Sequence, residues 1–340
     1  MTDLVTFGET MALFAARRTG PLRFARDFDL GLGGAESNVA IGVARLGHAV
    51  RWIGRVGADE FGDLIRSTLA GEGVDVRALP DEAATGLMIK GRRTADHIDV
   101  TYYRRGSAGS RLTPADLDPE LIRDARVLHL TAITPALSAS CRESVRHAVT
   151  VARAAGVTVS LDINYRRALW PPDEAGAWLR EMIGQVDVLF ATEAEGRLIT
   201  SPEAEGGLIA ATEAEGGLIS ADAGTVGGGT ESAELARALG AFGPRHVLVK
   251  LGSQGAIEWS GGRLLRAEPY QVTEVDPVGA GDGFAAGWLA DWLAGATPER
   301  RLETACAAGA FAVTSQGDWE SLPRRDDLRL LGRDGDGVSR

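Results

Sequence analysis

Short apolar runs alternate with helical patterns along the chain, and this alternation most restricts the possible folds. RVLHLTAI at 126–133, VTVSLDINY at 157–165 and VDVLFAT at 186–192 each follow a segment with helical periodicity. Strands that alternate with helices form βαβ units, whose strands run parallel. We therefore predict an α/β fold in three layers, with a mostly parallel central sheet flanked by helices. Ligands of such sheets bind beyond the carboxyl ends of the strands.

The same patterns predict the remaining elements. Strands are expected at Leu4–Phe7, 49–53 and around Val249, and helices at 33–47, 61–74 and 300–313. Thr297 and Pro298 would open the last of these helices as N-cap and first residue. Two β-hairpins are expected, one at 85–103 outside the main sheet and one at 256–268, while residues 10–31 read as irregular.

Three tandem ten-residue repeats run from Ala191 to Ser220. In one continuous α-helix each repeat would rotate by about 80°, so the repeated Leu-Ile pairs would not form one buried stripe. Pro202 and the paired glycines also disfavour a long helix, and a solenoid needs longer units. We interpret 192–230 as a local expansion plus a flexible loop within one domain, residues 1–330, followed by a polar tail at 331–340.

The composition and charge of the chain argue against several classes of protein function. The chain has 340 residues, a formal net charge of -11 and no clustered basic stripe, which argues against nucleic-acid binding. No run approaches the roughly 20 apolar residues that span a bilayer, so no membrane partner is expected. Cys141 and Cys306 form neither a disulfide framework nor a CxxC metal site. The first residues carry no export signal, so the expected location is cytoplasmic.

A glycine-rich turn at 275–292, VDPVGAGDGFAAGWLADW, precedes a helix expected to start near Gly281. Its apolar residues, from Phe284 to Leu293, recur at helical spacing and predict one apolar face. The free N–H groups and the dipole of a helix N-terminus attract anions, above all phosphate. Asp282 lies in the first turn, where a carboxylate can accept a proton from a hydroxyl. The alternative is an Asp that only stabilises the helix N-terminus.

Other turns also follow predicted strand ends. Gly33 and Gly34 are either a plain turn or a place where backbone approaches a sugar, with Asn38 as donor and acceptor. In DINYR, Asn164 and Arg166 would point the same way if the segment is extended. Arg166 is then either a surface charge or a fork that binds a carboxylate or phosphate.

Two further motifs allow two interpretations each. YYRRGSAGS from Tyr102 is either an exposed hairpin edge or a ligand contact made by one of its tyrosines. KLGSQG at 250–255 is either a hairpin turn or an approach to adenine or phosphates. No Walker P-loop occurs, and GAGDGF does not fit the dinucleotide pattern GxGxxG.

The stretch DPVGAGDGFAAG at 276–287 resembles the signature of the PfkB (ribokinase-like) sugar kinases. That resemblance implies a ribokinase-like fold with a small β lid, for which 10–31 and 85–108 are the candidates. It also implies that Asp282 is the catalytic base and that Gly279, Ala280 and Gly281 form the anion hole for the transferred phosphate.

The chain most resembles one branch of this family, the 2-keto-3-deoxygluconate kinases. GGAESNVA, TGLM, YYRRGSA, LHLTAITPALS, SLDINYRRALW and VLVKLGSQGA carry the resemblance, which spans Val5 to about Asp318 except the repeats. Contacts to a sugar acid are expected from Gly33, Gly34, Asn38, Met88, Tyr102, Tyr103, Arg104, Arg166, Asp282 and Asp318. Contacts to ATP are expected from Asn164, Arg166, Thr192, Lys250, Gly252, Gly255 and Gly279–Gly281, with Cys306 in the adenine pocket.

Three positions depart from the family pattern. Thr192 replaces the Asn of an Asn-x-x-Glu motif that helps to place Mg²⁺ through water. Glu195 would then serve the metal, although Glu205 or Glu215 of the later repeats could take its place. Met88 stands where some members carry a tyrosine, and Ala132 where glycine is common.

These residues together predict an ATP- and Mg²⁺-dependent kinase that converts 2-keto-3-deoxy-D-gluconate into its 6-phosphate and forms a homo-oligomer. Another sugar kinase of the family, such as a fructokinase or ribokinase type, is an alternative. A neutral sugar, however, gives no reason for the arginine pair after the tyrosines. A second alternative is a non-catalytic sugar-acid-binding protein in which the repeats block the Mg²⁺ or ATP site.

Overall fold

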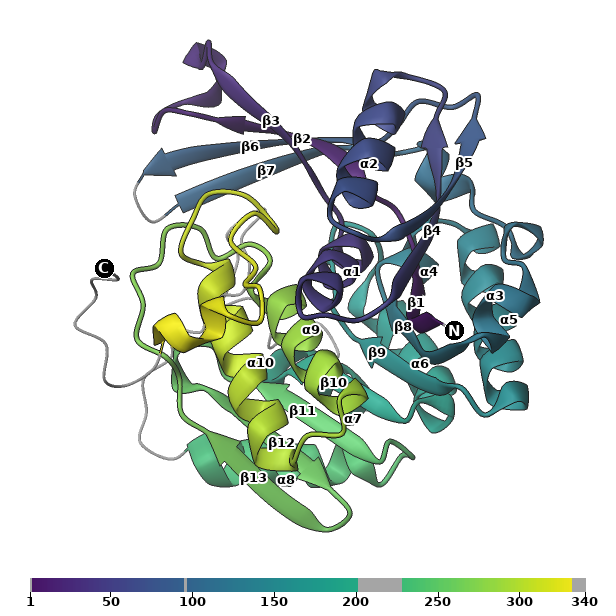
Figure 1. Ribbon diagram of the computed structural model, residues 1–340, viewed down its shortest axis with the longest axis vertical. Helices are drawn as coiled ribbons and strands as arrows, with labels where there is room; N and C mark the ends of the chain where they lie inside the picture. The colour runs from purple at the N-terminus through teal and green to yellow at the C-terminus, as the bar shows by residue number, and fades with distance from the viewer. Residues whose placement is uncertain (1, 95–96, 201–227, 332–340) are drawn as a thin grey trace.

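The computed structural model describes residues 2–94, 97–200 and 228–331. Within them, a nine-stranded sheet is flanked by helices on both faces, and a smaller four-stranded sheet extends from one side (Figure 1). This arrangement confirms the predicted three-layer α/β fold. The large sheet has the order β13-β12-β11-β10-β9-β8-β1-β4-β5. Its strands are β1 (Thr2–Phe7), β4 (Val50–Gly57), β5 (Asp75–Asp81), β8 (Ala125–Thr131), β9 (Thr158–Asp162), β10 (Val188–Thr192), β11 (His246–Lys250), β12 (Ala256–Ser260) and β13 (Arg263–Ala267).

Within this order, the neighbouring strands β11-β10-β9-β8-β1-β4-β5 all run parallel. β12 and β13 add an antiparallel hairpin at one edge of the sheet. The hairpin at 256–268 is therefore confirmed, as part of the main sheet. Its parallel strands are apolar on both sides because helices cover both faces. Leu4 of β1, for example, packs in one core, and its neighbour Val5 packs in the other.

The helices divide into two layers according to the core in which they pack. One layer comprises α1 (Ala35–Arg45), α2 (Glu60–Gly71), α9 (Ala280–Leu293) and α10 (Pro298–Ala312). The other comprises α3 (Pro119–Arg123), α4 (Thr134–Leu137), α5 (Ala139–Ala155), α6 (Pro172–Met182), α7 (Glu193–Thr200) and α8 (Gly228–Gly240). Thr297 caps α10 through its side chain, as predicted.

Helix α9 is buried almost all round, so the prediction of one apolar face was wrong. The helix lies between α1 and α10 and also packs on the sheet, where Trp288 meets the ring of Phe190. Helix α10 comes very close: a Cβ added at Gly287 would lie 2.6 Å from the Thr304 carbonyl oxygen. Glycine at this position therefore permits the close packing of the two helices.

The small sheet, here called the lid sheet, has the order β3-β2-β6-β7. Its strands are β2 (Met11–Ala16), β3 (Phe28–Gly33), β6 (Leu87–Thr94) and β7 (His97–Tyr103). The hairpin at 85–103 lies outside the main sheet, as predicted. The expectation of irregular structure at 10–31 was wrong, because β2 and β3 pair with each other as an antiparallel hairpin and β6 pairs in parallel with β2 from a distant part of the chain.

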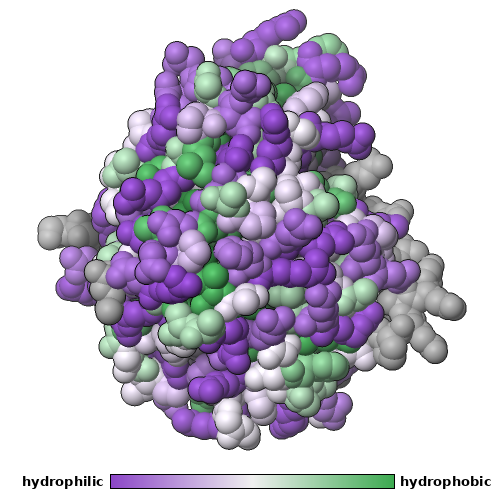
Figure 2. All heavy atoms as spheres, turned by 90° about the vertical axis from the view of Figure 1, so that its right-hand side faces the viewer, coloured by the Kyte–Doolittle hydropathy of each residue, from purple (hydrophilic) through white to green (hydrophobic). Residues whose placement is uncertain are grey.

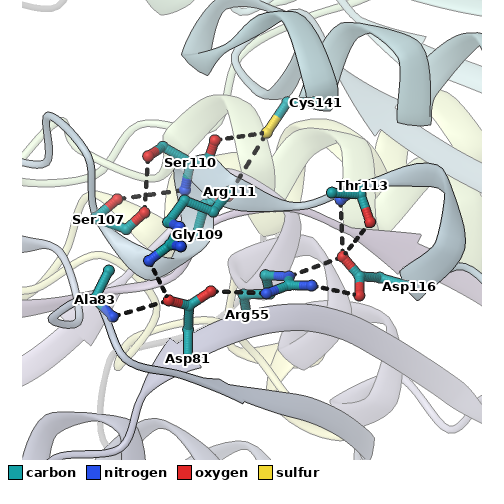
Figure 3. Close-up of polar contacts among 10 residues, drawn as sticks. All are labelled: Arg55, Asp81, Ala83, Ser107, Gly109, Ser110, Arg111, Thr113, Asp116 and Cys141. Carbon is teal, nitrogen blue, oxygen red and sulfur yellow. Dashed lines mark hydrogen bonds and ion pairs between the residues drawn. The ribbon is translucent and has the colours of Figure 1, made fainter.

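A polar cluster ties the segment that follows the lid sheet to the main sheet (Figure 3). Arg55 of β4 makes two hydrogen bonds of 2.8 Å to Asp116 and one of 2.7 Å to Asp81. Arg111 donates to the other oxygen of Asp81 at 2.7 Å. Two-pronged arginine–carboxylate pairs of this kind are geometrically specific. The chain that leaves β7 is thus held firmly against β4 and β5.

The surface on the side of α2 and β5 is mostly hydrophilic, with small separate apolar patches (Figure 2). Apolar residues scattered in this way are normal for a protein surface. Among the described residues, no helix has the length and apolarity needed to cross a membrane.

Part of the repeat region lies in the described chain. Residues 193–200 of the first repeat form α7, whose Leu198 and Ile199 pack in the core. The last three residues of the expected flexible loop, 228–230, belong to α8 instead. The later repeats and the tail after 331 lie outside the described residues.

Replacing Gly287 by Ala should destabilise the protein by roughly 1–3 kcal/mol, because the added methyl group meets α10 at close range. Gly71 is a matched control, since it also lies in a helix but a Cβ there would meet nothing within 4 Å. Gly71→Ala should leave stability unchanged or raise it by up to about 1 kcal/mol. Urea unfolding of both variants measures the difference, and equal stabilities would contradict the close packing.

Candidate active site

The glycine-rich turn lies between two close neighbours at the start of α9. Gly279 has a φ of 82° and is the N-cap, and the helix begins at Ala280, one residue from the predicted start. A Cβ at Gly279 would lie 2.0 Å from the Asp318 carbonyl oxygen, and one at Gly281 would lie 3.3 Å from Lys250 Nζ. The first N–H groups of α9 therefore lie beside a buried ammonium group, which suits an anion.

Asp282 is held between two amides from distant parts of the chain. Its Oδ2 accepts a hydrogen bond from Asn38 Nδ2 of α1 at 2.8 Å, and its Oδ1 accepts one from Asn164 Nδ2 at 3.3 Å. The residue is only 8% exposed. Asn38 Oδ1 is also buried and makes no hydrogen bond. A free acceptor therefore lies next to the carboxylate.

Burial raises the pKa of Asp282 to about 7, and the charge of Asp162 adds to this rise. The hydrogen bond from Asn38 and the charges of Arg166 and Lys250 act in the opposite direction. A carboxylate with this pKa is about half ionised at neutral pH, which suits a general base.

The segment after β9 was expected to be extended, and this was wrong. Asn164 has a φ of 39°, in the left-handed region, and this turn brings its amide to Asp282. The charge of Arg166 lowers the pKa of both Asp282 and Asp318, so Arg166 is within electrostatic reach of the two carboxyl groups. The structure joins Asn164 to Asp282 by a hydrogen bond, through a turn instead of strand alternation.

Lys250 makes a buried ion pair that the sequence did not reveal. Its Nζ lies 2.8 and 2.9 Å from the two carboxylate oxygens of Asp162, which ends β9. Burial lowers the pKa of Lys250, but the charges of Asp162, Glu195 and Asp282 more than offset this, so its pKa is raised and it stays protonated. Lys250 thus places a fixed positive charge between Asp162 and the glycine turn.

Glu195 links the end of β10 to the segment after β9. One of its oxygens accepts hydrogen bonds from Thr192 N at 2.7 Å and Thr192 Oγ1 at 3.0 Å, and the other accepts one from Tyr165 N at 2.9 Å. The first repeat thus supplies this Glu, while Glu205 and Glu215 lie outside the described residues. Within the described chain no group of three or more His, Cys, Asp or Glu side chains forms a metal site. A Mg²⁺ that arrives with nucleotide phosphates needs only one or two carboxylates, often through water.

Three residues that are predicted to contact the sugar, Gly33, Met88 and Asp318, lie close together at the lid sheet. A Cβ at Gly33 would lie 2.2 Å from Met88 Cε and 2.3 Å from Asp318 Oδ2. A Cβ at Gly34 would lie 2.5 Å from the Glu9 carbonyl oxygen. Close packing therefore explains why each of these two positions is a glycine. Their contact with a sugar stays a prediction.

The tyrosine–arginine motif lies on the lid. Tyr102 and Tyr103 of β7 are 41% and 61% exposed. The Arg104 guanidinium lies 5.6 Å from the centre of the Tyr102 ring, and it donates to Glu9 Oε2 at 2.7 Å. No contact between these three residues and Asp282 is seen in the described chain. The arginine that was expected to bind a sugar acid is thus already paired.

The other residues predicted to contact the nucleotide are Gly252 and Gly255, which follow β11, and Cys306 in α10. Gly252 and Gly255 have φ values of 56° and 85° and shape the turn after β11. A Cβ at Gly255 would lie 2.0 Å from the Ala267 carbonyl oxygen. Cys306 is buried in the core beside α9, and burial raises the pKa of its thiol to about 12.

Sequence reasoning missed several buried charges around this site. They are Glu9, Glu36, Lys90, Asp162 and Asp276. For two of them, Lys90 and Asp162, the signal was a charged residue at the end of or inside an apolar run, a pattern that is costly unless a partner is present.

The raised pKa of Asp282 makes a prediction about stability. The folded protein holds a proton on Asp282 up to about pH 7, whereas the unfolded chain releases it near 3.8. Relative to Asp282→Asn, the wild type should therefore lose stability as pH rises from 4 to 8, by on the order of 4 kcal/mol. Urea unfolding of both proteins across this range measures the difference, in which the other titrating groups cancel. A constant difference would contradict the raised pKa.

Comparisons with known proteins show the family of this chain. Residues 1–325 match the pfkB family carbohydrate kinase. The chain is 37% identical over 333 residues to a 2-dehydro-3-deoxygluconokinase of Bacillus subtilis strain 168, covering 96% of this chain and 94% of the relative. It is 36% identical over 329 residues to the enzyme of the same name from Thermoproteus tenax, covering 95% and 92%.

A solved structure shows the same fold. An E. coli protein described as a ribokinase II, in complex with ATP and Mg²⁺, superposes with a TM-score of 0.80 at 26% identity, covering 97% of this chain and 99% of that one. The match over residues 1–325 spans both the main sheet and the lid sheet. The chain belongs to the pfkB family of carbohydrate kinases, and it is a phosphotransferase with an alcohol group as acceptor.

Proposed function

We propose that this kinase transfers the γ-phosphate of ATP to the terminal hydroxyl of 2-keto-3-deoxy-D-gluconate, giving the 6-phosphate. The observation that carries the mechanism is the Asp282 carboxylate, buried between two amides at the N-terminus of α9 with a pKa of about 7. The substrate is supported by the two relatives named 2-dehydro-3-deoxygluconokinase. The ATP and Mg²⁺ bound to the E. coli neighbour support the donor.

In the proposed reaction, Asp282 accepts the proton of the sugar hydroxyl while the oxygen of that hydroxyl bonds to the γ-phosphorus. The bond from that phosphorus to the bridging oxygen breaks, and ADP leaves with the electron pair. The unpaired Asn38 Oδ1 beside the carboxylate is the candidate acceptor for a second sugar hydroxyl. N–H groups at Gly279–Gly281 and the nearby Lys250 ammonium would stabilise charge on the transferred group.

Mg²⁺ supplies further charge neutralisation on the phosphates when it is bound. The carboxylates of Glu195 and Asp162, both within electrostatic reach of Lys250, fit this role through water molecules. On the sugar side, Arg166 is the stronger candidate for the substrate carboxylate, because its charge already acts on Asp282 and Asp318. Arg104 would have to share its guanidinium with Glu9.

Substrate access requires movement, since Asp282 is only 8% exposed. The lid sheet is the natural moving part, because two chain segments far apart in sequence form it beside the site (Figure 1). We propose that it opens to admit the sugar acid and closes to exclude water, which would otherwise compete for the phosphate. A homo-oligomer stays a prediction, which light scattering in solution would test.

Asp282→Asn should lower kcat roughly 100-fold or more, because the amide cannot accept the proton. Asp291→Asn is the matched control. Asp291 is also buried in α9, but it bonds to Thr304 and Arg325 away from the glycine turn. Its variant should keep a near-normal kcat even if it is less stable. ADP release in a coupled assay measures both, and near-normal turnover of Asp282→Asn would refute the base role.

A substrate panel tests the acceptor. With ATP fixed, kcat/KM should be highest for 2-keto-3-deoxygluconate or its galactonate-derived epimer and much lower for fructose and ribose, which lack a carboxylate. Arg166→Met should reduce this preference, because it removes a charge that can pair with the acid. A higher kcat/KM for fructose or ribose would identify the enzyme as another type of sugar kinase.

A further inference from the structure

Lysine is very rare in this protein, and the side chains of both lysines are largely covered. Of the 36 Lys and Arg residues only two are lysines, Lys90 and Lys250. Each amino group lies against buried carboxylates. The compact ammonium of lysine fits such positions, whereas the planar guanidinium of arginine needs more room. Lys250 belongs to the site described above, but the proposed mechanism has no role for Lys90.

Lys90 connects the lid sheet to the main body. It lies on β6 and is 4% exposed. Its Nζ lies 2.9 Å from Asp276 Oδ2 and 2.7 Å from Asp318 Oδ1. Burial lowers the pKa of Lys90, but the two carboxylates more than offset this, so its pKa is raised and the group stays charged.

Both carboxylate partners belong to the segments that shape the glycine turn. Asp276 Oδ1 accepts a hydrogen bond from Val278 N at 3.1 Å, and its Oδ2 accepts one from Gly317 N at 3.4 Å. The carbonyl oxygen of Asp318 is the atom against which Gly279 packs. One ammonium group therefore holds together the approach to the turn at 276–279 and the loop at 317–318.

A second cation on the same face of β6 contacts the same segment. Arg92, two residues after Lys90, donates to the carbonyl oxygen of Val275. Between these side chains lies a small cavity of about 10 Å³, lined by Ala16, Lys90, Arg92, Ile98, Asp276 and Gln316. That volume is close to the space for one water molecule. The lid and the main body thus meet here through a few charged contacts, with a gap beside them.

We propose that Lys90 is a positioning residue for phosphoryl transfer: docking of β6 places its ammonium between Asp276 and Asp318, and this fixes the glycine turn and Asp318 for catalysis. The inference rests on the proposed function, since it assigns the turn to the transferred phosphate. Without Lys90, two buried carboxylates would face each other without a cation between them, an arrangement that buried sites tolerate poorly. The turn would shift, and the cost would appear mainly in kcat, because misplacement of about 1 Å can slow a reaction roughly 100-fold.

The test compares Lys90→Ala with Arg93→Met, which removes an exposed cation from the same strand. Steady-state kinetics are measured with ATP and whichever acceptor the wild type uses best, 2-keto-3-deoxygluconate or fructose. Each variant is also assayed with added ethylammonium, and with tetramethylammonium at the same ionic strength as a cation too bulky for the site. Thermal unfolding is recorded for every protein.

We expect kcat of Lys90→Ala to fall roughly 100-fold, a larger change than in either KM, and to recover several-fold with ethylammonium but not with tetramethylammonium. Arg93→Met should behave as wild type. A folded Lys90→Ala protein with unchanged kcat would overturn the inference. So would a loss of activity that ethylammonium does not restore, since that result indicates structural damage only. If the wild type prefers fructose, the proposed substrate fails while the test of Lys90 remains valid.

Discussion

Burial of one carboxylate at the start of α9 is the constraint on which the rest of the site depends. An ionised carboxylate away from water is costly unless donors surround it. Asp282 receives them from α1 and from the turn after β9, which are separated by more than a hundred residues of chain. The same burial brings its pKa to about 7, so the packing that hides the group also makes its carboxylate more basic.

Two clusters of charged side chains lie near that carboxylate. One cluster is the Lys250–Asp162 pair at the ends of β11 and β9, and the other is the Lys90–Asp276–Asp318 cluster below the lid sheet. Each cluster places a lysine ammonium next to a residue of the glycine turn or to a segment that packs on it. Because buried ion pairs contribute little net stability, we infer that these two clusters serve mainly to hold the neighbouring segments in position.

Much of the fold could be predicted from local patterns. Apolar runs such as 126–133 predicted β8 because a parallel strand covered on both faces must be apolar on both sides. The motif around Asp282 predicted a helix start within one residue, since glycine and the following apolar spacing are local signals. Strands β2 and β3 pair with each other as a local hairpin that was missed, and β2 also pairs with β6, more than fifty residues away, a partner of which local sequence carries no record.

The sequence by itself determined the chemistry that is available: the glycine turn, its aspartate, the amide of Asn38 and the arginine of DINYR. The tertiary structure alone decided which of these groups meet and in what state. Asn164 reaches Asp282 through a left-handed turn, Arg104 is paired with Glu9, and the first repeat supplies the glutamate beside Thr192. Pairing, burial and the resulting pKa depend on distances between residues far apart in the chain, and only the packed fold sets those distances.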